Sequence, residues 1–205
     1  MSKILDKIKS FFKANGEIIT PTAVLAIICV VVTLALSSTN LLTADRILSL
    51  SIEKENNAMS KLIEADKYLW CPGVTDDDRS YNIAIKENEP VGIILTTEAN
   101  GYGGVISVMT AVDMEGKIVA IEILEAADET PGLGQNVTKP DWYSQFSGLK
   151  NDITVIKGGS AIQENNEVNA VTGATISSKA VTTAVNQALD YAQEIIAKGD
   201  FEIEQ

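Results

Sequence analysis

The chain has 205 residues with 28 acidic and 16 basic side chains, which gives a formal charge of −12. Such an acidic chain repels phosphate backbones, so we expect no nucleic-acid binding. The absence of histidine excludes Ser-His-Asp hydrolysis and histidine-ligated zinc or haem. Two cysteines are too few for a site of four thiolates. Any redox chemistry must therefore use an organic cofactor.

The N-terminal part contains an uncharged run over residues 18–44. About twenty apolar residues at ~1.5 Å each span a hydrocarbon core, so the run predicts a transmembrane helix over 18–43. The alternative is a cleaved signal peptide, for which Ala35-Leu36-Ser37 would be a suitable site. We favour the uncleaved anchor because the apolar run is too long for a typical signal peptide.

The charges that flank this helix predict its orientation. Four lysines (residues 3, 7, 9 and 13) precede it, and only Arg46 and Lys54 follow within the first fifteen residues. By the positive-inside rule, residues 1–17 are a cytoplasmic segment and residues 44–205 form an extracytoplasmic domain. We therefore expect a single-pass protein of the cell (inner) membrane, in contact with the lipid bilayer. Residues 2–13 additionally fit an amphipathic helix at the membrane surface.

The predicted elements of the outer domain follow in order. A helical apolar pattern runs from Asp45 to Leu69 and ends before Pro72-Gly73. Asp76-Asp77-Asp78 lacks the spacing of a calcium loop, so we expect a solvated turn and no metal site. Strands are predicted at 81–86, 91–97, 105–112, 117–124 and 153–157, with a hairpin at 114–116, and a long amphipathic helix at 176–198. Strands clustered between flanking helices predict an α+β domain with a mostly antiparallel sheet.

Two segments point to ligand chemistry. Residues 169–178, Asn-Ala-Val-Thr-Gly-Ala-Thr-Ile-Ser-Ser, open the last helix, where free N–H groups suit a phosphate. The plainer interpretation is a helix N-cap formed by Thr175, Ser177 or Ser178. Residues 129–134, Glu-Thr-Pro-Gly-Leu-Gly, predict a tight turn whose backbone can approach a flat ring, and the alternative is an ordinary surface turn. Glu129 is either a hydrogen-bond partner of that ring or a solvated acid.

These segments resemble motifs of the FMN-binding domain family. Thr172-Gly173-Ala174-Thr175 resembles its flavinylation motif, in which an acidic residue and two variable residues precede Ser/Thr-Gly-Ala-Thr. Asn169 stands where the family usually has Asp. Residues 129–134 are similar to the family's Glu-Thr-Pro-Gly-Leu-Gly loop, and Gly-Tyr-Gly-Gly at 101–104 lies in the expected order. The resemblance covers nearly the whole chain. It is closest to the G subunits of Rnf electron-transport complexes, with the C subunits of sodium-pumping NADH:quinone oxidoreductases as more distant relatives.

The resemblance implies a covalent cofactor and a set of residues that hold it. FMN would be joined through a phosphoester to Thr175 by a dedicated flavin transferase, and no catalytic acid or base is expected. The other implied cofactor-binding residues are Thr172, Gly173, Ala174, Ser177, Glu129, Thr130, Gly132, Leu133 and Gly134. Tyr102, Trp142 and Tyr143 could stack on the flavin, but single aromatic residues more often belong to the core.

The resemblance also implies a function and partners. The protein would be an electron-transfer subunit of an ion-translocating oxidoreductase complex. That complex couples ferredoxin:NAD⁺ oxidoreduction to Na⁺ or H⁺ transport, and its other subunits would be the partners. The alternative left open by the residues themselves is a non-catalytic extracytoplasmic binding or scaffold module, whose Thr-rich turn only caps a helix.

Overall fold

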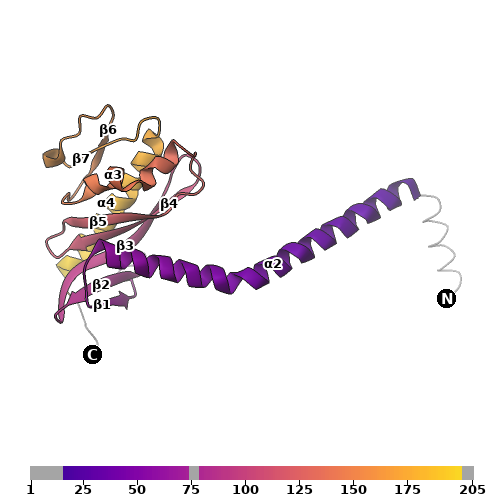
Figure 1. Ribbon diagram of the computed structural model, residues 1–205, viewed down its shortest axis with the longest axis horizontal. Coiled ribbons are helices and arrows are strands. Elements are labelled where there is room, and N and C mark those ends of the chain that lie inside the picture. The colour runs from indigo at the N-terminus through magenta and orange to yellow at the C-terminus, as the bar shows by residue number, and fades with distance from the viewer. Residues whose placement is uncertain (1–15, 74–78, 200–205) are drawn as a thin grey trace. The chain divides into compact units, whose positions relative to one another are not determined.

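The computed structural model of the chain describes residues 16–73 and 79–199 (Figure 1). The chain divides into two compact units, Met1–Ile52 and Glu53–Gln205. The predicted surface helix at 2–13 and the turn at Asp76–Asp78 lie outside the described residues.

The first helix, α2, runs from Gly16 to Leu62 and includes the whole predicted span. By length and composition it is the one helix of the described chain that could cross a membrane. The hydroxyl groups of Ser38, Thr39 and Thr43 donate to carbonyl oxygens four residues earlier, at 2.7, 2.9 and 3.0 Å. Hydroxyls bonded within their own helix do not need water, so they suit a hydrocarbon environment.

The end of α2 differs from the prediction. The helix ends at Leu62, and Lys67–Cys71 form strand β1, so the prediction of helix to Leu69 is wrong. Strand β1 pairs antiparallel with β2 (Tyr81–Lys86). The apolar pattern of residues 62–71 fits either structure locally. Pairing with the edge of a sheet formed by later residues decides in favour of the strand.

Five strands form one antiparallel sheet in the order β1-β2-β3-β4-β5. Strands β3 (Glu89–Asn100), β4 (Val105–Asp113) and β5 (Ile118–Glu125) confirm the predicted strands with small changes at their ends. The β2–β3 turn has positive φ at Glu87 and Asn88, which is the backbone of a tight two-residue hairpin. A separate parallel pair joins β6 (Thr154–Ile156) to β7 (Glu167–Asn169), and β7 was not predicted. The α+β class with a mostly antiparallel sheet is confirmed.

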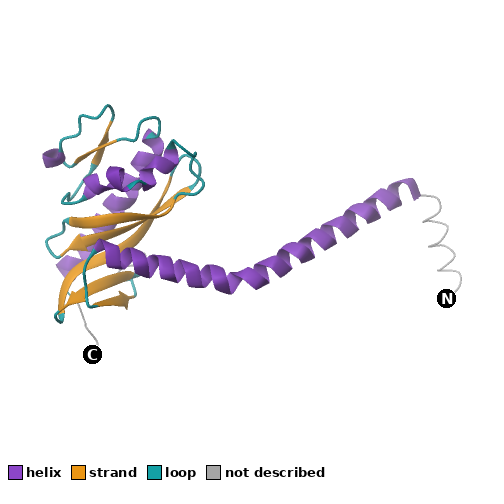
Figure 2. Cartoon of the chain, in the orientation of Figure 1, coloured by secondary structure: helices purple, strands orange, loops and turns teal. Residues whose placement is uncertain are grey.

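Helical segments cover both faces of the sheet (Figure 2). The last helix, α4 (Thr175–Lys198), packs on β3 and β4, close to the predicted range. On β4, Val108 and Val112 belong to the core under α4, and Met109 and Ala111 to a second core. The second core also contains Ala58, Met59 and Leu62 from the last two turns of α2. This alternation follows from the two-residue period of a strand.

Short helical segments connect β5 to the parallel pair. They are η1 (Gly134–Thr138), α3 (Pro140–Tyr143) and η2 (Ser144–Phe146), with η3 (Gln163–Asn165) between β6 and β7. The indole N–H of Trp142 donates to the carbonyl oxygen of Asn169 at 2.7 Å. The Trp142 ring also meets the Phe146 ring edge-on, with centroids 5.6 Å apart. The hydrogen bond to Asn169 ties this connecting segment to β7, which precedes the start of α4.

Candidate functional site

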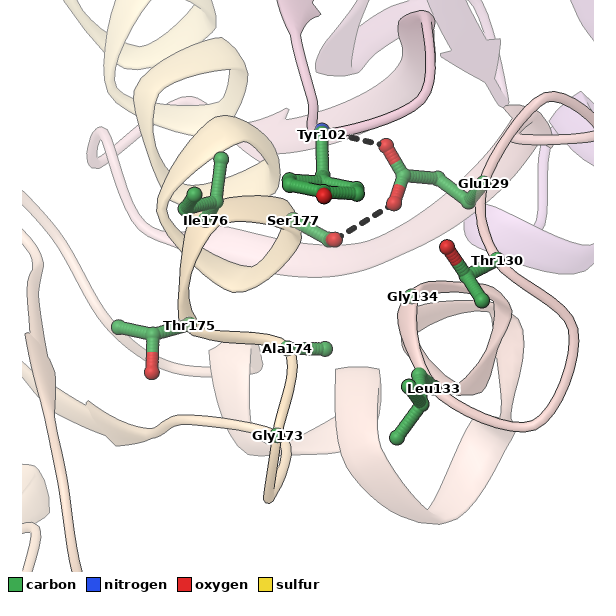
Figure 3. A pocket seen from close by; sticks show the side chains of 10 residues that line it. All are labelled: Tyr102, Glu129, Thr130, Leu133, Gly134, Gly173, Ala174, Thr175, Ile176 and Ser177. Carbon is green, nitrogen blue, oxygen red and sulfur yellow. Dashed lines mark hydrogen bonds between the residues drawn. The ribbon is translucent and has the colours of Figure 1, made fainter.

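A cavity of about 580 Å³ opens where three distant segments meet: the 101–104 loop, the 129–134 loop and the start of α4 (Figure 3). We name it the Glu129 cavity; it is lined by Tyr102, Glu129, Thr130, Leu133, Gly134, Gly173, Ala174, Thr175, Ile176 and Ser177. The structure thus brings together eight of the ten cofactor-binding residues implied by the sequence. The other two, Thr172 and Gly132, do not line it.

Glu129 is the most tightly held side chain of this cavity. It is 1% exposed, so its interpretation as a solvated acid is wrong. Its Oε1 accepts the backbone N–H groups of Tyr102 and Gly103, at 2.7 and 3.0 Å. Its Oε2 accepts the hydroxyl of Ser177 at 2.6 Å (Figure 3). One carboxylate therefore joins all three segments that form the cavity.

The environment of Glu129 favours its ionised form. Burial by itself raises the pKa of the Glu129 carboxyl. The hydrogen bond from Ser177 and those from the backbone N–H groups of Gly103 and Tyr102 act in the opposite direction and prevail, so the pKa is lowered. The carboxylate is therefore negatively charged at neutral pH.

The glycines of both loops fit around this carboxylate. A Cβ added to Gly101 would stand 2.1 Å from Oε1 of Glu129, and one added to Gly134 would stand 2.1 Å from Oε2. A Cβ added to Gly103 would stand 1.9 Å from the backbone oxygen of Asp128. Glycine at these positions thus allows the two loops to pack closely against Glu129 and Asp128. The sequence alone did not predict this role.

The start of α4 carries no side-chain cap. Its N-cap residue is Ala174, so the interpretation of Thr175, Ser177 or Ser178 as the cap is wrong. Ser178 instead accepts the N–H of Val171 and donates to the carbonyl oxygen of Ala174, each at 2.9 Å, which fixes the turn before the helix. Thr175 is the first residue of α4 and is partly exposed. Within the described chain, its hydroxyl has no hydrogen-bond partner.

A second cavity of about 480 Å³ adjoins the first at Gly173 and Thr175, which line both. We name it the Lys157 cavity; its other lining residues are Lys157, Gly158, Gly159, Ala170, Val171 and Thr172. The sequence analysis missed Lys157 as a site residue because no local motif links it to Thr175. Asn169 Oδ1 accepts the N–H of Ala161 at 3.0 Å and so closes the loop that follows Lys157.

The three aromatic candidates have different positions. Tyr102 lines the Glu129 cavity and is 71% exposed. Trp142 packs against the core, and the Tyr143 hydroxyl donates to Glu122 Oε2 at 2.8 Å. Neither lines the cavity. Across residues 16–73 and 79–199, no group of three or more His, Cys, Asp and Glu side chains could hold a metal ion. Both cysteines are free.

Comparisons with known proteins agree with these features. The model of the FMN-binding domain family matches residues 101–190. The chain is 32% identical over 180 residues to the G subunit of the proton-translocating ferredoxin:NAD(+) oxidoreductase complex of Clostridium ljungdahlii, and the match covers 87% of this chain and 93% of that protein. It is 31% identical over 189 residues to the G subunit of the Na(+)-translocating complex of Acetobacterium woodii, and this match covers 84% and 90%.

Solved structures share the fold. The crystal structure of Shewanella oneidensis NqrC superposes with a TM-score of 0.53 at 22% identity, covering 63% of this chain and 68% of that one. The C subunit of the Na(+)-translocating NADH-quinone reductase from Parabacteroides distasonis gives a TM-score of 0.50 at 23% identity, covering 58% and 62%. The extent and identity of the matches to the two G subunits settle the family. The chain belongs to the G subunits of the ion-translocating oxidoreductase complexes of the Rnf type.

Proposed function

We propose that this chain carries FMN in the Glu129 cavity, attached through a phosphoester to Thr175. It then relays electrons as one subunit of an Rnf-type complex, whose other subunits are its partners. The complex couples ferredoxin:NAD⁺ oxidoreduction to the translocation of Na⁺ or H⁺. When bound, FMN supplies the capacity to accept and release electrons, and the protein holds and orients it.

The observation that carries this proposal is the meeting of three separate segments around one cavity with Thr175 at its border. A volume of about 580 Å³ lies within the range of cofactor sites, roughly 300–1,000 Å³. The walls differ in character, with Leu133 and Ile176 on apolar sides and Glu129 on a polar one. Apolar walls with a few fixed polar groups suit a flat heteroaromatic ring with a polar tail.

The surroundings of Thr175 suit a phosphodiester. The first N–H groups of α4 have no capping side chain, and the helix dipole places partial positive charge there. Lys157 and Thr175 both line the adjoining cavity, so Lys157 adds a cation to the surroundings of Thr175. The Thr175 hydroxyl is free of other bonds to the described residues, so it is available for attachment by a flavin transferase.

The anchor and its orientation are the second part of the proposal. Residues 18–43 cross the cell membrane, residues 1–17 lie in the cytoplasm, and residues 44–205 form the extracytoplasmic domain. The exposed apolar side chains of α2 support this assignment, together with the lysine bias before the helix. Protease added to intact spheroplasts should remove the domain. Protection there, with cleavage only in inverted vesicles, would reverse the orientation.

The flavin itself is tested on the full chain co-expressed with the flavin transferase. We expect yellow fluorescence that stays with the denatured protein on a gel, and a peptide containing Thr175 whose mass is increased by FMN less one water. A wild-type protein without flavin would instead favour the scaffold module.

A further inference from the structure

Glu129 is a buried carboxylate whose partners are all uncharged. Its two oxygens accept two backbone N–H groups and the Ser177 hydroxyl. Among residues 16–73 and 79–199, no lysine or arginine forms an ion pair with it. The hydrogen bonds stabilise the negative charge, but no cation cancels it.

The surroundings select an ionised acid at this position. Two of the three hydrogen-bond partners of the oxygens are backbone N–H groups, which can only donate, and the Ser177 hydroxyl also donates here, which matches a carboxylate. Gly101 and Gly134 come so close that a Cβ on either would overlap a carboxylate oxygen. Two loops far apart in the sequence are therefore shaped to hold one anion in the wall of a cavity.

A fixed negative charge in the wall of a cavity changes the reduction potential of a cofactor bound beside it. Each electron added to a cofactor carries a negative charge, and a nearby negative charge makes that addition less favourable. The effect is stronger in a partly buried cavity than in water, because the effective dielectric constant is lower. Charge near a flavin is one of the means by which proteins set its electronic properties.

We propose that Glu129 lowers the reduction potential of the flavin held in the Glu129 cavity. This inference rests on the proposed function, since it requires FMN in that cavity. The Glu129 carboxylate is then a potential-setting group as well as the link between three segments. It neither gives nor takes a proton in this role, and the electrons come from an external reductant.

The experiment is a potentiometric titration of the flavin in the purified full chain, with dithionite as the reductant. Glu129→Gln removes the charge but retains an oxygen for the two N–H groups, and the Ser177 hydroxyl can rotate to accept from the new amide. We expect the equilibrium constant for reduction to rise at least tenfold, which for a two-electron couple is about 30 mV towards higher potential.

Two controls separate charge from structure. Asp128→Asn removes a neighbouring acid that is exposed to water, so the potential should change far less. Ser177→Ala retains the charge but removes one hydrogen bond, so it should not raise the potential as Glu129→Gln does. If Glu129→Gln matches Asp128→Asn, or if Ser177→Ala causes the same rise, the inference is overturned.

Two further outcomes are distinguishable. If Glu129→Gln does not melt cooperatively, Glu129→Met removes the same charge with a side chain of similar length. A rise in potential then supports the inference, and no rise overturns it. If the wild type carries no flavin, the proposed function fails and this inference fails with it. If the flavin is bound but its potential changes in none of these variants, this inference is contradicted and the proposed function is not.

Discussion

The two cavities that meet at Thr175 differ in how they hold charge. In the Glu129 cavity, the charge is a carboxylate that is 1% exposed and fixed by three hydrogen bonds. In the Lys157 cavity, it is an exposed ammonium that makes no ion pair with any described residue. The Glu129 carboxylate is therefore held in one position, whereas the Lys157 side chain is free to change its conformation. Substitutions should therefore act on geometry and potential in the first cavity, and on attachment in the second.

The largest expected effect belongs to the residue that both cavities share. Thr175→Ala should abolish covalent flavin, because it removes the oxygen that the phosphoester requires. The fold should change little, since Ala174 is the N-cap and the Thr175 hydroxyl bonds to no described residue. We expect the free energy of unfolding to stay within about 0.5 kcal/mol. In-gel fluorescence and thermal melting in detergent measure the two quantities.

Thr175→Ser and Ser177→Ala are the matched controls for this prediction. The serine variant retains an oxygen at the same position and should be flavinylated in part. The Ser177 hydroxyl is bonded to Glu129, so Ser177→Ala should retain the covalent flavin. An adduct that persists in Thr175→Ala, or that mass spectrometry places on Ser177, would contradict the assignment.

The next largest effect is expected from a substitution that disturbs the packing around the Glu129 carboxylate. Gly134→Ala would place a Cβ 2.1 Å from Glu129 Oε2 and 3.0 Å from Ser177 Oγ, so it should destabilise the protein by about 1–3 kcal/mol. In a Glu129→Ala background the 2.1 Å overlap with Oε2 is removed, while the contacts with Ser177 Oγ at 3.0 Å and the Cβ of residue 129 at 3.1 Å remain. The cost of Gly134→Ala should therefore shrink. Gly132→Ala meets nothing within 4 Å but sits at φ +76°, so its cost should be equal in both backgrounds. Melting of the single and double variants decides. Equal costs for Gly134→Ala would show that the carboxylate does not shape the loop.

A smaller effect is expected in the Lys157 cavity. Lys157→Glu should slow attachment of FMN several-fold, because it places a like charge near the phosphate, while exposed charge pairs contribute only about 0.2–1 kcal/mol. Added salt should reduce the difference. The measurement is the rate of flavin incorporation by the purified transferase. Lys150→Glu is an exposed control of the same charge change outside the cavity, and an equal slowing there would point to net charge alone.

The smallest effect concerns pH. The pKa of Glu129 is lowered in the folded protein, so the ionised carboxylate adds stability above the unfolded value of about 4.3. That contribution is lost as the pH falls through the lowered folded-state pKa. Between pH 7 and pH 3.5, the melting temperature of the wild type should therefore fall more steeply than that of Glu129→Gln. Parallel profiles would mean that folding does not shift the pKa of Glu129, and a shallower fall in the wild type would mean that its pKa is raised.

Local patterns predicted much of the fold. The strands at 81–86 and 105–112 and the helix at 176–198 depend on periodicities that are visible within a single segment, and the structure confirms them. The first part of strand β1 was predicted as helix because the strand depends on pairing with β2, which is a later segment of the chain. Strand β7 was missed because three residues are too short a run to show a period, and its pairing with β6 supplies the hydrogen bonds.

The sequence by itself determined the apolar helix, the antiparallel strands and the motif around Thr175, because each depends on neighbours within a few residues. Only the tertiary structure decided that Glu129 is buried, that the Ser177 hydroxyl donates to it, and that Lys157 lines the same cavity as Thr175. These facts depend on contacts between residues tens of positions apart. Packing on a twisted sheet brings such residues together, and no local pattern encodes that arrangement.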